Sequence, residues 1–365
     1  MATIINADTS EGLKFTSDTS GELELQSGGV TQAKITSSGL TDTNNNVITS
    51  QSGKNLIING DMRVNQRTEA DAFTITADNL YGLDRWVGRT FGGTGRFSMQ
   101  KVEDAPAGFT YSNEIVVTTT ATSGSGGYAL EQRVEGRNLT MLNYGTADAK
   151  SLTLSFWIKS SVVGTYAVSL RTSTVGASGI SSCHDTFEIS TANTWQKVTH
   201  TFPANTAYDT VTSDVTAIFL DICFGARTTH ATSTLNTWEL GNFPFVTGQT
   251  DVLQTSGATI NITAVQLEVG TTATPFETLM HPQQLSMCQR YYFNFSGTLH
   301  GGDYSTNGFV TGVFPTQMRA APTITFTAAR TPLQGIGFGY TRAEFFSGYM
   351  GNSPYVQNLV ADAEI

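Results

Sequence analysis

The sequence has few charged residues, few cysteines and no long apolar run. Only 14% of its 365 residues are charged, against roughly a quarter in an average soluble protein. No apolar run approaches the roughly 20 residues that a membrane helix needs, so we expect no membrane insertion. The opening residues lack the basic and apolar regions of a secretion signal, so we expect no export.

The charge that is present is mainly acidic, with 20 basic and 30 acidic residues and a formal net charge of −10. This balance argues against nucleic acid as a partner. Cys183, Cys223 and Cys288 are far apart and form no C-x-x-C motif. We expect small buried thiols in a reducing compartment, not a disulfide framework or a zinc site. A single bridge between Cys183 and Cys223 stays open as an alternative.

Catalytic motifs are missing as well. The sequence contains no HExxH, no P-loop and no G-x-S-x-G motif, and its five histidines are scattered. We therefore expect no catalytic residue, no cofactor and no metal, and we interpret the chain as a non-enzyme. The two carboxylates of a glycoside hydrolase can be far apart in the sequence and come together only in the folded protein. A polysaccharide depolymerase therefore remains an alternative.

Threonine and glycine are abundant instead. Threonine makes up about one residue in six, well above ordinary usage, and there are 36 glycines. Threonine suits the solvated face of a strand, and glycine suits the tight turns between strands. The chain is also longer than one core usually organises. We predict a mainly β protein with more than one structural region.

The first region, residues 1–53, is too poor in apolar residues to fold alone. Short apolar pieces such as Leu23-Glu-Leu25 and Ala33-Lys-Ile35 alternate with period two and are separated by Gly and Ser. We predict short strands that fold against copies of the chain or against a partner, followed by a linker near residues 42–53.

The second region, residues 54–277, is predicted to be an antiparallel β-sandwich. Segments 152–158, 166–170, 218–224 and 261–269 alternate apolar and polar residues, with no helical pattern between them. The tryptophans at positions 86, 157, 195 and 238 lie in or beside such segments. We favour packing of these rings in the core over stacking on a ligand.

The third region, residues 278–365, begins with a helix signal. Pro282 suits a first helical position, and no helix breaker follows it before Arg290. The chain then becomes rich in Tyr and Phe, with candidate strands at 308–314 and 323–327. We predict a short helix followed by a small β-rich C-terminal domain.

An ordered series of phrases carries a family resemblance: NLIINGDMRVNQR (55–67), YGLDRW (81–86), LSFWIKSS (154–161), QLEVGTTATPFE (266–277) and CQRYY (288–292). The series resembles bacteriophage tail-fibre or virion-adhesin proteins, of podoviruses and myoviruses of marine and cyanobacterial hosts. The N-terminal residues 1–18 are similar to the start of cyanophage structural proteins.

The resemblance implies a homotrimeric fibre on the virion, assembled in the host cytoplasm. Residues 1–50 would join a tail, portal, adaptor or capsid protein, a jelly-roll sandwich would follow, and the distal region would bind a host surface glycan. The chain departs from the family in having no long shaft. The shared phrases look structural, and we expect Asp84 and Arg85 to form a buried hydrogen-bonded pair. The resemblance therefore supplies no binding residue.

Candidate ligand-binding residues come from the composition of the C-terminal region. Tyr rings stack on sugars, and Tyr among Gly, Ser and Asn is typical of recognition surfaces. The candidates, all expected in loop-like settings, are Tyr304, Tyr340, Tyr349 and Tyr355, with Asp303 and Asn307 as secondary choices. The alternative for each ring is packing in the core of the small domain.

The leading hypothesis is a structural phage fibre that recognises a bacterial surface polysaccharide. One alternative is a decoration protein of the capsid or tail with no host ligand. The other, and weaker, alternative is a tailspike depolymerase.

Overall fold

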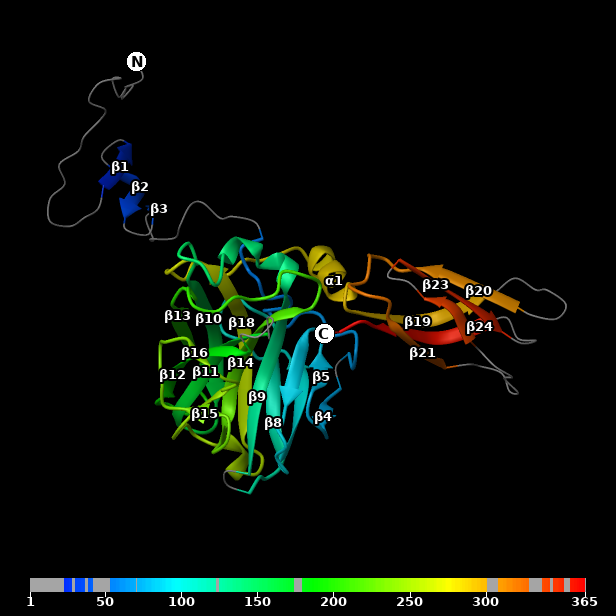
Figure 1. Cartoon of the computed structure of the whole chain (residues 1–365), viewed down its shortest axis with the longest axis horizontal. Helices are drawn as coiled ribbons and strands as arrows, with labels where there is room; N and C mark the ends of the chain where they lie inside the picture. The colour runs from blue at the N-terminus through cyan, green and yellow to red at the C-terminus, as the bar shows by residue number, and fades with distance from the viewer. Residues whose placement is uncertain are drawn as a thin grey trace, which may run out of the picture. The chain divides into compact units, whose positions relative to one another are not determined.

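The computed structural model describes residues 23–27, 30–36, 39–41, 53–69, 71–122, 125–173, 179–300, 308–327, 337–341, 344–350 and 355–364. The chain divides into two compact units (Figure 1). The first comprises residues 1–53 and 274–277, and the second comprises residues 54–273 and 278–365.

The first unit contains a small antiparallel sheet of strands β1 (Leu23–Ser27), β2 (Val30–Thr36) and β3 (Gly39–Thr41). Leu23 lies opposite Ile35 and Leu25 lies opposite Ala33, so these four apolar residues share one face. Glu24 lies opposite Lys34 on the other face. The predicted period-two alternation is confirmed for these two pieces, and residues 1–22 of the first region lie outside the described residues.

The second unit contains two large sheets with antiparallel strand pairs. The six-stranded sheet has the order β13 (Gln196–Phe202), β10 (Leu152–Ser160), β18 (Thr259–Val269), β8 (Ser112–Thr119), β7 (Arg96–Val102) and β4 (Phe73–Ile75). The seven-stranded sheet has the order β16 (Glu239–Leu240), β12 (Ser181–Ile189), β11 (Gly164–Thr172), β14 (Thr216–Arg227), β9 (Ser125–Glu135), β6 (Trp86–Arg89) and β5 (Leu80–Leu83). Sequence neighbours often lie in different sheets, as in a jelly roll. The predicted antiparallel β-sandwich is confirmed.

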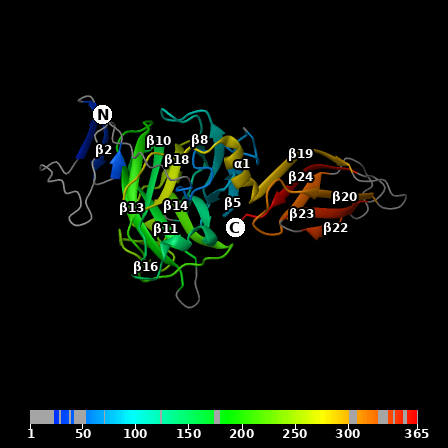
Figure 2. The same ribbon diagram turned by 90° about the horizontal axis from the view of Figure 1, so that it is seen from above.

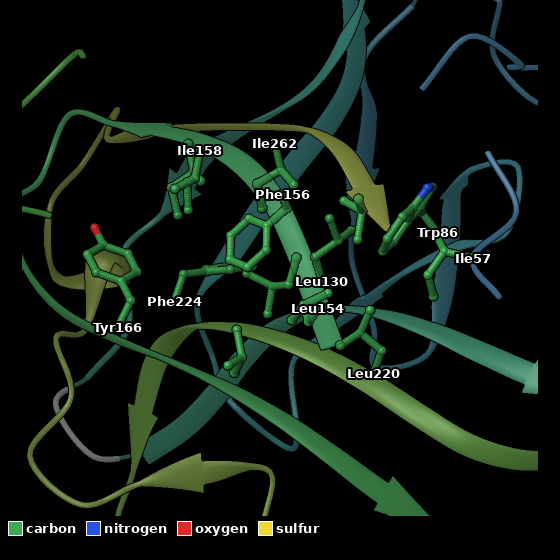
Figure 3. Close-up of a cluster of buried hydrophobic side chains, with 14 of the residues drawn as sticks. Ile57, Trp86, Leu130, Leu154, Phe156, Ile158, Tyr166, Leu220, Phe224 and Ile262 are labelled. Atoms are coloured by element: carbon green, nitrogen blue, oxygen red, sulfur yellow. The ribbon is translucent and has the colours of Figure 1, made fainter. Parts of the chain in front are cut away.

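The core of the sandwich lies between these two sheets (Figure 3). Leu154 and Phe156 from β10 meet Leu220 and Phe224 from β14, because alternate residues of each strand point inward. Trp86 is completely buried and donates from its indole N–H to the carbonyl of Asn59 at 2.9 Å. The predicted core role is confirmed for Trp86, whereas the rings at 157, 195 and 238 are half-buried.

Short elements complete the sandwich. A parallel strand pair links β15 (Ala231–Thr232) with β17 (Phe245–Val246). Single 3₁₀ turns occur at Gly136–Asn138, Thr140–Leu142 and Val252–Gln254. All three cysteines are free and buried, so the expected small buried thiols are confirmed.

Helix α1 (His281–Gln289) follows the sandwich, as the sequence predicts. Its first turn is fixed by Gln283, whose side-chain oxygen accepts from the Met280 N–H at 3.1 Å. Cys288 packs with Ile58 and Val64 of the sandwich's opening segment. The described helix is too short to span a membrane, and no other described helix is long and apolar enough.

Two three-stranded sheets form the C-terminal region (Figure 2). One has the order β19 (Tyr292–His300), β24 (Tyr355–Asp362) and β21 (Thr323–Thr327). The other has the order β20 (Gly308–Val313), β23 (Phe345–Met350) and β22 (Gly337–Thr341). We call the first of these, β19-β24-β21, the tip sheet. The predicted strands near 308–314 and 323–327 are confirmed.

Candidate functional site

The tip sheet has one apolar and one polar face. On β19, Phe293 and Phe295 alternate with Tyr292, Asn294 and Ser296. The apolar face packs in a small core with Leu359, Ala361, Phe314 and Met318. The opposite face carries polar groups, and it includes Asn294 and Thr325, both paired in register with Val360.

The strand at the centre of this sheet has an unusual backbone at Asn358. This residue has a φ of 51°, in the left-handed region that few residues other than Gly and Asn adopt. Both neighbouring ladders shift register there, β19 between Phe295 and Thr298 and β21 between Thr325 and Thr327. A β-bulge of this kind re-aims a side chain, and backbone strain is often kept where function requires it.

The polar face borders a hollow of about 430 Å³, within the usual size range of small-molecule sites. Its lining residues are Arg67, Tyr292, Asn294, Ser296, Thr325, Asn358 and Val360. The Asn294 amide N–H donates to the Gln66 carbonyl at 2.8 Å, which fixes the amide and leaves its oxygen for another donor. Within the described residues, the side chains of Ser296, Thr325 and Asn358 have no hydrogen-bond partner.

Arg67 belongs to the sandwich but lines this hollow. Its guanidinium lies 3.7 Å from the ring centre of Tyr292 and 4.9 Å from that of Tyr81. It donates to Glu364 at 3.0 Å and lies 3.6 Å from Asp362. Burial lowers the pKa of Arg67, but these two carboxylates outweigh it and raise the pKa above its ordinary value. The cation is therefore permanent and already paired.

A second buried arginine holds the end of the C-terminal strand. Arg85 donates to Glu364 and to the carbonyl of Arg133, and its guanidinium lies 3.6 Å from the ring centre of Tyr291. Burial raises the pKa of Tyr291 to about 12. Arg85 and Glu364 thus fix the β24 end against the sandwich and set the position of the hollow.

The expected pairing between Asp84 and Arg85 is wrong, although both side chains are buried. The Asp84 carboxylate accepts two hydrogen bonds from Gln66, one from the backbone N–H and one from the side-chain amide, each at 2.6 Å. Arg85 has a φ of 70°, and its guanidinium donates to Glu364 instead. Gln66 is 18 residues from Asp84, and Glu364 is 279 residues from Arg85. The neighbouring positions of Asp84 and Arg85 in the sequence therefore predicted the wrong partner for each.

A network of charges lies on the face of the seven-stranded sheet that points away from the core. Arg171 donates to Asp221 at 2.8 Å and to Glu131 at 2.7 Å, and both carboxylates are completely buried. Arg89 and Arg133 donate to the same Glu131. Burial raises the pKa of Glu131, but the three guanidinium groups outweigh it and lower the pKa below its ordinary value. These partners use the carboxylates fully, so the network stabilises the sheet.

The predicted ligand-binding residues fall into two groups. Asp303, Tyr304 and Asn307 lie outside the described residues. Tyr340, Tyr349 and Tyr355 lie in strands β22, β23 and β24, so their expected loop setting is wrong. The alternation of polar and aromatic residues along 292–296 was the sequence signal for the polar face. No sequence signal predicts that Arg67 lines the hollow, because Arg67 and Tyr292 are separated by more than 200 residues of sequence.

No protein-family model matches the sequence, and no curated protein matches it. Among solved structures, the chain is similar to the enzymatically active domain of tailspike protein 4 from bacteriophage CBA120, at 13% identity and a TM-score of 0.33. That alignment covers 60% of this chain and 22% of the other, so the chain spans about a fifth of that domain. It is also similar to the family 11 carbohydrate-binding module of a cellulosomal cellulase of Clostridium thermocellum, at 12% identity and a TM-score of 0.29. There the alignment covers 56% of this chain and 98% of the module.

Proposed function

We propose that this chain is a structural phage fibre protein that binds a bacterial surface polysaccharide. The observation that carries the proposal is the hollow on the polar face of the tip sheet. Its rim holds Asn294, Asn358 and Thr325, which have hydrogen-bonding atoms not used within the described residues. Amide and hydroxyl groups at fixed positions are suited to the hydroxyls of a sugar, because each sugar hydroxyl both donates and accepts.

The proposed interaction is binding without hydrolysis. The two buried carboxylates Glu131 and Asp221 are held by arginines, which leaves no free acid there to protonate a glycosidic oxygen. A test is incubation of the protein with bacterial capsule and lipopolysaccharide. Release of oligosaccharides that depends on one Asp or Glu would favour the depolymerase alternative.

The first unit supports assembly into a homotrimer on the virion. The apolar face of its sheet is partly exposed, with Leu25 and Ile35 each 44% exposed. A three-stranded sheet needs such a face covered for independent stability. Further copies of the chain would cover it, and residues 1–50 would join a tail, portal, adaptor or capsid protein of the particle.

The binding proposal is tested with the purified full chain on an array of bacterial surface polysaccharides. Asn358→Gly keeps the left-handed backbone and removes the amide, so we expect at least a tenfold loss of affinity. The matched control is Asn193→Gly, since Asn193 is also left-handed, with a φ of 57°, but does not line the hollow. The control is expected to bind normally. A folded protein that binds no glycan would favour the decoration alternative.

A further inference from the structure

The hollow contains a cation, but the charge of that cation is already balanced. Arg67 is paired with Glu364 and Asp362, and Glu364 also accepts from Arg85. The buried Asp84 lies beside the same group of charges, and within the described part of the chain its carboxylate receives hydrogen bonds from Gln66 alone. Arg67 is the cation among the residues that line the hollow, and these carboxyl groups balance its charge, so the lining offers no unpaired positive charge to an anionic ligand.

Asp362 places an exposed negative charge on the polar face. Asp362 lies two residues from Val360 on β24, on the same face, and is paired in register with Tyr292. Its side chain is 42% exposed. A sugar carboxylate or sulfate near Val360 would meet this charge at short range, which is unfavourable.

Ring stacking is also limited in this hollow. Tyr292 is only 7% exposed, and the guanidinium of Arg67 already covers its ring at 3.7 Å. The groups left for a ligand are the amides of Asn294 and Asn358, the hydroxyls of Ser296 and Thr325, and the methyl groups of Val360. These are neutral groups that recognise hydroxyls and short apolar patches.

We infer that the hollow binds an uncharged, hydroxyl-rich sugar unit, held by hydrogen bonds to Asn294 and Asn358 and without aromatic stacking. This inference rests on the proposed function and specifies its ligand class. Arg67 acts as a positioning residue that orders Tyr292 and the end of β24, and it makes no ionic contact with the sugar.

The test uses the full chain on printed bacterial polysaccharides sorted into uncharged and acidic sets, at 50 mM and 500 mM NaCl. We expect binding to uncharged members, with less than a twofold change in affinity between the two salt concentrations. Asn358→Gly should lower that affinity at least tenfold. Asp362→Asn removes the negative charge and should leave neutral binding within twofold while increasing retention of acidic members.

Three outcomes distinguish the inference from the proposed function. Binding to uncharged glycans that is insensitive to salt supports both. Preferential binding to acidic glycans that weakens tenfold or more in high salt overturns the inference and leaves the proposed function standing. Binding to neither set by a folded protein overturns the proposed function, and the inference falls with it.

Discussion

At the scale of single residues, the chain keeps polar side chains where ordinary sandwich packing does not require them. Asn358 holds a left-handed backbone in the middle of a strand, and its amide lines the hollow. Glu131 is completely buried and is bound by three arginines. The Asn358 side chain is exposed and has no hydrogen-bond partner among the described residues, whereas the Glu131 carboxylate accepts from three arginines. This difference is why we propose a binding role for Asn358 and a structural role for Glu131.

The backbone at Asn358 predicts a difference between two substitutions. Asn358→Ala should destabilise the protein by about 1 kcal/mol relative to Asn358→Gly, because a Cβ without a compensating polar group disfavours the left-handed region. Urea unfolding followed by tryptophan fluorescence measures the difference. Equal stability of the two variants would mean that the bulge relaxes to an ordinary strand.

The pKa of Glu131 predicts how stability depends on pH. Its pKa is lowered in the folded state, so its stabilising effect is complete above the unfolded pKa of about 4.3 and is lost as pH falls through the folded value. Glu131→Gln should cost about 3–5 kcal/mol at pH 7, since it leaves buried guanidinium groups without their carboxylate.

Unfolding free energies from pH 3 to pH 7 check this prediction. The gap between the unmodified protein and Glu131→Gln should narrow below about pH 4.3. Glu114→Gln, in the half-buried strand β8, serves as the control and should show little effect at any pH. A gap that stays constant across this range would contradict the assignment.

At the scale of elements, the C-terminal strand links the tip sheet to the sandwich. β24 is the central strand of the tip sheet, and Glu364, two residues beyond it, pairs with both Arg67 and Arg85. Arg319 donates to the carbonyl of Ala363 at 2.9 Å in the same place. The polar face of the tip sheet therefore depends on ion pairs made outside that sheet.

Removing the Glu364 charge should loosen this strand. In Glu364→Gln, the buried guanidinium of Arg85 loses its carboxylate. We therefore expect amide exchange in residues 355–364 to accelerate about tenfold or more, while exchange in β10 and β18 stays unchanged. Hydrogen–deuterium exchange with mass spectrometry measures it. Glu344→Gln is the matched control, because Glu344 is exposed in the C-terminal region and its side chain accepts from Gln317 alone among described residues. Uniform acceleration across the whole chain would instead indicate global destabilisation.

At the scale of the whole molecule, apolar residues on one face of the described sheet of the first unit are partly exposed, Leu25 and Ile35 at 44% each. Leu25→Ser combined with Ile35→Ser should shift the mass measured by light scattering from trimer to monomer, because it removes the apolar area that copies would bury. Glu24→Gln changes the opposite face of the same sheet and should leave the trimer intact. A monomeric unmodified protein would contradict the proposed assembly.

The sequence by itself predicted the elements that depend on local pattern. Alternation along 152–158 and 218–224 predicted strands β10 and β14 and their buried residues, because a strand's two faces follow directly from a period of two. The helix at Pro282 and the three free, buried cysteines were also predicted from the residues near each position in the sequence. These features need only a residue and its near neighbours in the chain.

Only the tertiary structure decided which polar groups meet. Arg67 reaches Tyr292, Asp362 and Glu364 across more than 200 residues of sequence, and the buried Asp221 is bound by Arg171 from another strand. Tyr340, Tyr349 and Tyr355 were chosen from composition and lie in strands, since the aromatic content of a segment does not distinguish a strand from a loop. Ion pairs and a polar hollow depend on directions and distances between elements that are remote in sequence, and folding alone fixes these.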